Sequence, residues 1–241
     1  MQPIIGIIGR NHQDYDLNHR LIGISEDLRR AVIKTGGIPI IINPPQDVEY
    51  YDAVPSKLPK LTKEDKEFLD RQLSLCNGII IPGGIKRFEY DVYALEYAIK
   101  NDIPTLGICI GMQVMTMLNE QGEMVTSNSK IETGVDHCKL DEDYVHDVIL
   151  DKESILYKIL GKDRIRVNSR HTMEVKDTVM FKTFGKSEDG VIEEIEKQDQ
   201  SFMIGVQWHP EILINLGDLD SFKIFEAFIK KAEEIDNDSK V

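Results

Sequence analysis

Thr105-Leu106-Gly107-Ile108-Cys109-Ile110-Gly111-Met112-Gln113 is the segment around which this 241-residue sequence is organised. The residues before Cys109 are apolar and β-prone, and those from Met112 onward are good helix formers, so a strand passes into a helix at the cysteine. Gly107 and Gly111 allow the backbone to turn back tightly, which is the pattern of a nucleophile elbow. The simpler interpretation is a buried structural cysteine in a strand-to-helix turn, because free cysteine is among the most buried residue types. The choice depends on whether a base and an oxyanion hole occur elsewhere in the sequence.

A base for the cysteine is predicted near the end of the chain. Of the six histidines, only His209 directly follows a predicted buried strand and has a carboxylate, Glu211, two residues later. Pro210 between them favours an extended backbone, so that both side chains point broadly the same way. Glu211 would then orient the imidazole, and His209 would take the proton of Cys109, which is the logic of a catalytic triad. An ordinary turn with an exposed histidine and glutamate is the alternative.

An oxyanion hole is predicted where the apolar strand 78–81 ends in Pro82-Gly83-Gly84. The backbone N–H groups of Gly83 and Gly84, together with that of Ile110 after the cysteine, would stabilise the negative oxygen of a tetrahedral intermediate. A plain strand-to-helix turn has the same composition.

Short apolar runs alternate with helical patterns, which favours a mostly parallel sheet covered on both faces. We expect strands at 4–8, 38–42, 78–81, 104–108 and 202–206, helices at 18–35, 62–76, 91–101 and 220–234, and antiparallel strands at 147–150, 164–168, 181–184 and 190–195. Thr62 and Asp65 would cap the second helix. No linker divides the sequence, so we expect residues 1–241 to form a single domain.

Composition excludes several classes of protein. The net charge of −13 disfavours nonspecific binding to nucleic acid or anionic lipid, and no apolar run is long enough for a membrane span or signal peptide. Three irregularly spaced cysteines argue against a disulfide framework and fit a cytoplasmic protein. We expect no cofactor and no metal site, because the group His12, Asp14, Asp16 and His19 has no recognised ligand spacing. The acidic residues Glu193, Glu194 and Glu196 are interpreted as a solvated face.

Three motifs in this order resemble the class I glutamine amidotransferase-like superfamily: Pro82-Gly83-Gly84, residues 107–113 around Cys109, and residues 205–211 ending in His209-Pro210-Glu211. The resemblance implies a flavodoxin-like three-layer α/β sandwich with a mostly parallel central sheet and a small antiparallel addition. It also implies an enzyme in which Cys109 attacks a γ-glutamyl carbonyl, His209 acts as general base and then acid, and Glu211 orients His209. Gln113 matches a position that helps hold the glutamyl part of the substrate.

Two branches of the superfamily remain open. The segment Val167-Asn168-Ser169-Arg170-His171 resembles the free-standing γ-glutamyl-γ-aminobutyrate hydrolases, and in that branch His171 would line the substrate pocket. Ile110 resembles instead the glutaminase subunits of biosynthetic amidotransferases, which deliver ammonia to a synthase partner. We favour a hydrolase of a small γ-glutamyl amide, cleaved through a cysteine thioester, because its resemblance extends over more segments. A homodimer is compatible with either branch.

Overall fold

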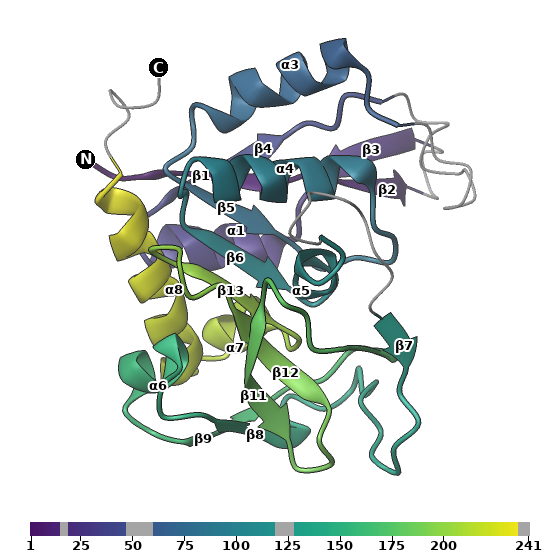
Figure 1. Cartoon of the computed structure of the whole chain (residues 1–241), viewed down its shortest axis with the longest axis vertical. Coiled ribbons are helices and arrows are strands. Elements are labelled where there is room, and N and C mark those ends of the chain that lie inside the picture. Colours follow the sequence, from purple (N-terminus) through teal and green to yellow (C-terminus); the bar gives the residue numbers. More distant parts are fainter. Residues whose placement is uncertain (15–18, 47–59, 119–127, 236–241) are drawn as a thin grey trace.

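One sheet of nine strands organises the computed structural model, which describes residues 1–14, 19–46, 60–118 and 128–235 (Figure 1). Its parallel part consists of β4 (Ile38–Ile42), β1 (Ile4–Ile8), β5 (Gly78–Ile81), β6 (Thr105–Ile108) and β13 (Met203–Val206), in that order. The order continues antiparallel through β12 (Ile192–Glu196), β11 (Lys182–Ser187), β8 (His146–Leu150) and β9 (Arg164–Val167). The expected parallel centre with an antiparallel addition is confirmed, and the addition extends the same sheet.

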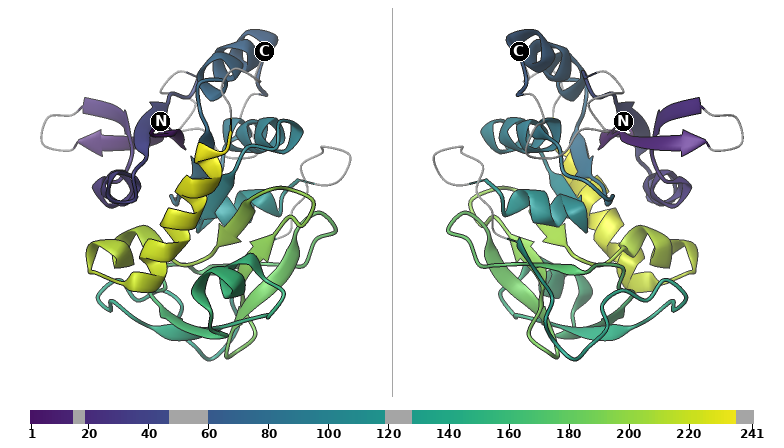
Figure 2. Two further views of the ribbon diagram at one scale, coloured as in Figure 1. Left: turned by 90° about the vertical axis from the view of Figure 1, so that its left-hand side faces the viewer. Right: turned by 90° about the vertical axis from the view of Figure 1, so that its right-hand side faces the viewer.

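Helices cover both faces of the sheet, which gives the three layers visible in Figure 2. On one face α1 (Glu26–Lys34), α7 (Pro210–Asn215) and α8 (Leu219–Glu233) pack together, with α6 (Ile155–Leu160) against α8. On the other face lie α3 (Lys63–Leu73), α4 (Glu89–Lys100) and α5 (Ile110–Met115). The central strands are buried on both sides, and every residue of β5, β6 and β13 is buried. This double burial explains their continuous apolar sequences.

The expected cap of α3 is present. The Thr62 hydroxyl accepts from the Asp65 N–H at 3.1 Å, and the Asp65 carboxylate accepts from the Thr62 N–H at 2.8 Å. This reciprocal arrangement satisfies two N–H groups that the first turn of a helix leaves unpaired.

The predicted helix over residues 18–35 is wrong in its first half. Residue 18 lies outside the described residues, and β3 (His19–Gly23) pairs antiparallel with β2 (Arg10–Asp14). The helix begins only after Ser25, whose hydroxyl accepts from the Leu28 N–H at 3.2 Å. Before Ser25, the pairing of β3 with β2 therefore outweighs the helical spacing of the apolar residues. A separate two-stranded antiparallel sheet joins β7 (Asn128–Lys130) to β10 (Met173–Val175).

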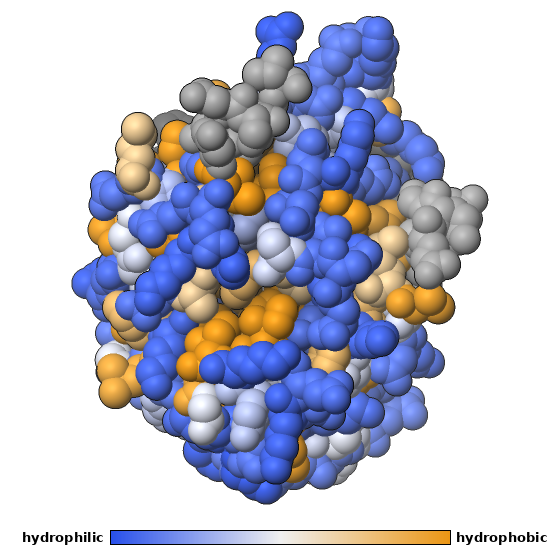
Figure 3. Space-filling view, turned by 60° about the vertical axis from the view of Figure 1, so that its left-hand side comes forward, coloured by the Kyte–Doolittle hydropathy of each residue, from blue (hydrophilic) through white to orange (hydrophobic). Residues whose placement is uncertain are grey.

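The acidic residues of β12 are also placed differently from the expectation. Glu193, Glu194 and Glu196 are fully buried, not solvated, because β12 lies between β13 and β11 with both faces covered. Hydrophilic side chains predominate instead on the outside, as the face in Figure 3 shows, with hydrophobic ones gathered in small patches. Within the described residues, no helix combines the length and hydrophobicity needed to cross a membrane.

Candidate active site

Cys109 stands on a strained turn between β6 and α5. Its backbone has φ 51° and ψ −105°, a conformation that non-glycine residues rarely adopt. The Cys109 N–H donates to the Val206 carbonyl at 2.8 Å, which ties the turn to the neighbouring strand β13. A backbone held in such a conformation costs about 1–3 kcal/mol and is typical of functional sites.

The glycine at position 111 makes this turn sterically feasible. A Cβ atom added to Gly111 would overlap the carbonyl oxygen of Ile81, and one added to Gly107 would lie 2.9 Å from the Gly111 carbonyl carbon. The start of α5 therefore packs directly on the backbone of β5 at Gly111 and on that of β6 at Gly107, and each approach requires its glycine.

His209 and Glu211 form a close pair beside the elbow. His209 Nδ1 lies 2.7 Å from Glu211 Oε1, which leaves Nε2 for Cys109. The expected extended run through Pro210 is wrong, because Pro210 begins helix α7. A proline is well tolerated at the first position of a helix, where its missing N–H would have no partner, and the first turn brings Glu211 to the imidazole.

The charge state of His209 is shifted strongly. Burial opposes the charged imidazole, but the attraction of Glu211 and hydrogen bonds with Cys109 and Glu211 outweigh it and raise the pKa of His209 to about 10. The ring is therefore an imidazolium at neutral pH in the resting protein. A proton is available on His209 before any substrate arrives.

Asn168 fixes the backbone of His209, a role that sequence reasoning did not assign. The Asn168 amide donates to the His209 carbonyl at 2.9 Å, and the His209 N–H donates to the Asn168 side-chain oxygen at 2.8 Å. The hydrolase-like segment 167–171 contains Asn168, but the resemblance indicated His171 as its functional residue.

The glycine turn after β5 lies against the pair of Cys109 and His209. A Cβ on Gly83 would be 2.8 Å from His209 Cε1 and 3.6 Å from Cys109 Cβ. Gly84 lies against the side chain of Arg10, and Ile110 follows Cys109 as the first residue of α5. The structure thus brings the three predicted oxyanion residues to the carboxyl ends of β5 and β6.

Arg10 holds this turn in place. Its guanidinium donates to the Pro82 carbonyl at 2.8 Å and to the Gly83 carbonyl at 3.3 Å. It also pairs with Asp91 at 2.5 Å, and Asp91 accepts from the Phe88 N–H at 3.0 Å. Both charged side chains are buried, so the guanidinium is a positioning group for the turn and not a free substrate ligand.

A cavity of about 410 Å³ opens beside this site. Its lining includes Gly83, Gly84, Arg170, His209 and Glu211. The volume suits a small molecule.

The lining of this cavity includes neither Cys109 nor the two predicted substrate-binding residues. Gln113 is buried, and its amide donates to the Gln207 side-chain oxygen at 3.4 Å. His171 is buried among His137, His146 and Glu193. Neither belongs to the described lining of the cavity.

Comparisons with known proteins identify the family of this chain. The sequence model of a family described as Peptidase C26 matches residues 3–211. A putative glutamine amidotransferase-like protein of Rickettsia prowazekii is 25% identical over an alignment that covers 97% of this chain and 99% of the relative. A CTP synthase of Porphyromonas gingivalis is 32% identical over 65% of this chain and 34% of the relative. The chain thus spans about a third of the length of the CTP synthases it matches.

Solved structures share the fold at low identity. The glutaminase domain of a Trypanosoma brucei CTP synthase, with bound acivicin, superposes with a TM-score of 0.65 at 18% identity, covering 98% of this chain and 95% of that domain. A glutamine amidotransferase from Thermotoga maritima gives a TM-score of 0.55 at 13% identity, with 97% of each chain covered. The flavodoxin-like expectation is confirmed by this likeness. Since the family match extends over residues 3–211, the chain belongs to the Peptidase C26 family of class I glutamine amidotransferase-like proteins.

Proposed function

We propose that this protein hydrolyses a γ-glutamyl amide through a thioester on Cys109. The observation that carries the proposal is the strained elbow at Cys109, beside a His209 whose imidazole is bonded to Glu211 at 2.7 Å. An activated cysteine needs a base, and the base needs an orienting group. Cys109, His209 and Glu211 supply these three groups and lie next to one another in this order.

The raised pKa of His209 favours a thiolate and imidazolium pair as the starting state. The Cys109 sulfur attacks the γ-carbonyl carbon, and N–H groups of Gly83, Gly84 and Ile110 stabilise the resulting oxyanion. His209 gives its proton to the leaving nitrogen as the carbon–nitrogen bond breaks, which releases ammonia or an amine and leaves the acyl group on sulfur. Neutral His209 then takes a proton from water, whose oxygen attacks the thioester, and glutamate leaves as the thiolate and imidazolium return.

Arg170 supports a substrate with a free carboxylate. Its side chain lines the cavity, and its buried Nε has no hydrogen-bond partner within the described chain, although Nη2 donates to the Leu140 carbonyl at 3.3 Å. A guanidinium with an unused donor binds a carboxylate well. The α-carboxylate of a glutamyl group is the partner that we assign to it.

The first experiment tests the nucleophile. A glutamine-analogue electrophile should add one mass adduct to the wild-type protein, and Cys109→Ala should lose both the adduct and amide hydrolysis. Cys138→Ala is the matched control, because Cys138 is the exposed free thiol of the chain. If Cys109→Ala keeps its hydrolytic rate, the proposal is wrong.

A second experiment separates the two branches. Glutamine and a panel of γ-glutamyl amines should be turned over by the protein alone if it is a free-standing hydrolase, the branch supported by the match along almost the whole Rickettsia relative. The alternative, ammonia delivery to a synthase, is favoured by Ile110 beside the nucleophile. Activity that appears only after a partner is added would support this alternative. No disulfide joins Cys76, Cys109 and Cys138, which fits a reducing, cytoplasmic setting in either case.

A further inference from the structure

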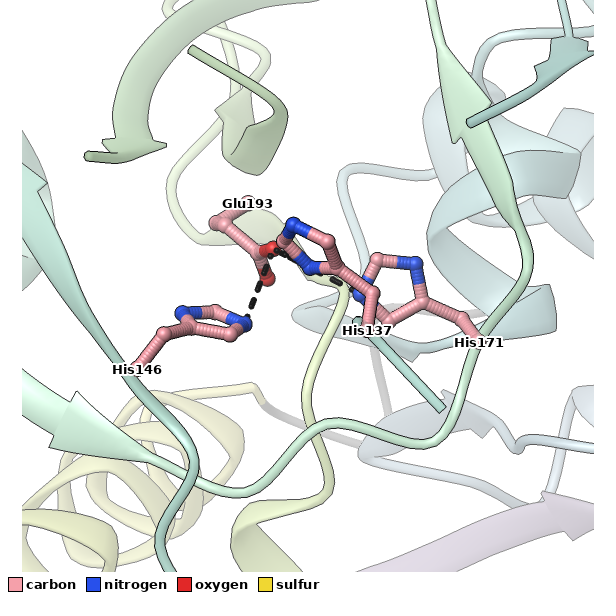
Figure 4. A group of neighbouring side chains, drawn as sticks. All are labelled: His137, His146, His171 and Glu193. Atoms are coloured by element: carbon pink, nitrogen blue, oxygen red, sulfur yellow. Dashed lines mark ion pairs between the residues drawn. The ribbon is translucent and has the colours of Figure 1, made fainter. Parts of the chain in front are cut away.

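Three buried histidines surround one carboxylate on the antiparallel side of the molecule. His137 Nδ1, His146 Nε2 and His171 Nε2 lie 3.4, 3.4 and 3.5 Å from Glu193 Oε1. Figure 4 shows these side chains converging on the Glu193 carboxylate from separate segments of the chain. All four are at least nine-tenths buried, so the group has little contact with bulk water.

The outer hydrogen bonds determine which ring nitrogens carry protons. His146 Nδ1 lies 3.3 Å from the Asp147 carbonyl, and His171 Nδ1 lies 3.1 Å from the Met173 carbonyl. A carbonyl oxygen only accepts, so each Nδ1 carries the hydrogen, and in this tautomer each ring presents a bare Nε2 to the cluster. On the third ring, His137 Nε2 lies 3.1 Å from Asp189 Oδ2, and Nδ1, which faces Glu193, also lies 3.4 Å from the Ser169 hydroxyl.

Lone pairs therefore face lone pairs at the centre of the cluster. His146 Nε2, His171 Nε2 and both Glu193 oxygens are buried atoms without a hydrogen-bond partner in the described chain. Several buried polar atoms without hydrogen bonds cost free energy of folding. A carboxylate surrounded by unprotonated ring nitrogens is stabilised by a positive charge placed between them. The alternatives are extra protons on the rings or a metal cation.

The distances favour a cation with tetrahedral coordination. Zinc binds imidazole nitrogen and carboxylate oxygen at about 2.0–2.1 Å, so two ligands of a tetrahedron are about 3.3–3.4 Å apart. The three separations from Glu193 Oε1 match this edge, and all ligand atoms lie within 4.8 Å of one another. The widest separations between ring nitrogens must shorten by up to about 1.4 Å to complete the polyhedron.

The surroundings resemble those of a structural zinc site. Ligating histidines typically donate their second N–H to a carbonyl or carboxylate, as all three rings do here. The charges of Glu193 and Asp189 together balance a divalent cation. A surface cavity of about 130 Å³ whose lining includes His137 and His171 provides a path for the ion.

We propose that His137, His146, His171 and Glu193 bind one Zn²⁺ ion in a closed site with a structural role. The ligands join β8, β12, the segment before β8 and the loop between β9 and β10. That loop begins at Asn168, whose side chain holds the backbone of His209. No sequence spacing predicts such a site, because its ligands are far apart along the chain.

The test uses the full chain without an affinity tag. We expect about one zinc per chain by mass spectrometry of the metal after dialysis, and its removal by a chelator should lower Tm. Adding Zn²⁺ at 1,000 times its Kd should then raise Tm by roughly 8–16 °C. Co²⁺ in place of Zn²⁺ should give the intense visible absorption of a tetrahedral ion.

Variants locate the ion. His171→Gln and Glu193→Gln should lose the stoichiometric metal, whereas His209→Gln, a described histidine outside the cluster, should retain it. Metal-free protein whose Tm is unmoved by Zn²⁺, Co²⁺, Ni²⁺ or Mn²⁺ would overturn the proposal and leave a protonated histidine cluster. This result needs only the wild-type chain, so it stands even if a variant fails to fold, and it is independent of amide hydrolysis.

Discussion

Substitution of Gly111 by alanine sets two physical effects against each other at the elbow. Gly111 lies in helix α5, and alanine is better than glycine by about 1 kcal/mol in the interior of a helix. Helix propensity alone therefore predicts a more stable protein. The tertiary structure predicts the opposite result.

An alanine Cβ at position 111 would overlap the Ile81 carbonyl oxygen and lie 2.8 Å from its carbonyl carbon. Comfortable carbon–carbon contacts are about 3.5–4.0 Å, so α5 and β5 must separate by at least about 0.7 Å. Overpacking costs about 1–3 kcal/mol, and the upper end applies because the obstacle is the backbone of a central strand. After subtraction of the gain in propensity, we expect Gly111→Ala to lose about 2 kcal/mol, or roughly 4–8 °C in Tm.

Urea unfolding at constant pH measures this change. Gly134→Ala is the control, because a Cβ there meets nothing within 4 Å, and its effect should stay within about 0.5 kcal/mol. The displaced elbow should also slow acylation of Cys109 by up to about 100-fold. A Gly111→Ala protein as stable as the wild type would refute the close approach of α5 to β5.

Three further results are expected. Asn168→Ala removes both hydrogen bonds that hold the His209 backbone, so kcat should fall about 10- to 100-fold with little change in KM; an unchanged kcat would contradict this role. Because the folded pKa of His209 is raised to about 10, its contribution to stability is complete below about pH 6.5 and is lost as pH rises through 10. In Glu211→Gln, the unfolding free energy should fall less over this pH window than in the wild type. If the unfolding free energies of the two proteins change with pH in parallel, the result contradicts a stabilising pair of His209 and Glu211. Burial, reinforced by a hydrogen bond that protonated Glu194 donates to Glu196, raises the pKa of Glu194 well above its usual value, so this group stabilises the fold below its unfolded pKa and progressively less as pH rises. Glu194→Gln should therefore gain stability relative to the wild type with increasing pH. A difference in unfolding free energy that stays constant with pH would show that Glu194 is ionised in the folded protein.

Local sequence predicted the parallel strands and the elbow because these depend on short-range signals. The apolar runs of the central strands are continuous, and glycines at fixed offsets from Cys109 permit only a tight turn there. Predictions of secondary structure from local sequence patterns were wrong at two places. His19–Gly23 joined a hairpin instead of a helix, and Pro210 opened a helix instead of an extended run.

The sequence by itself determined that Cys109 occupies an elbow, that His209 and Glu211 follow a buried strand, and that Gly83 and Gly84 end another. These are properties of neighbouring residues, and local backbone chemistry is enough to produce them. Only the tertiary structure decided that Arg10 holds the glycine turn and that Asn168 holds His209. It alone also buried three distant histidines around Glu193. The physical reason is that strand order brings such residues together, and burial then makes each polar atom depend on partners remote in the chain.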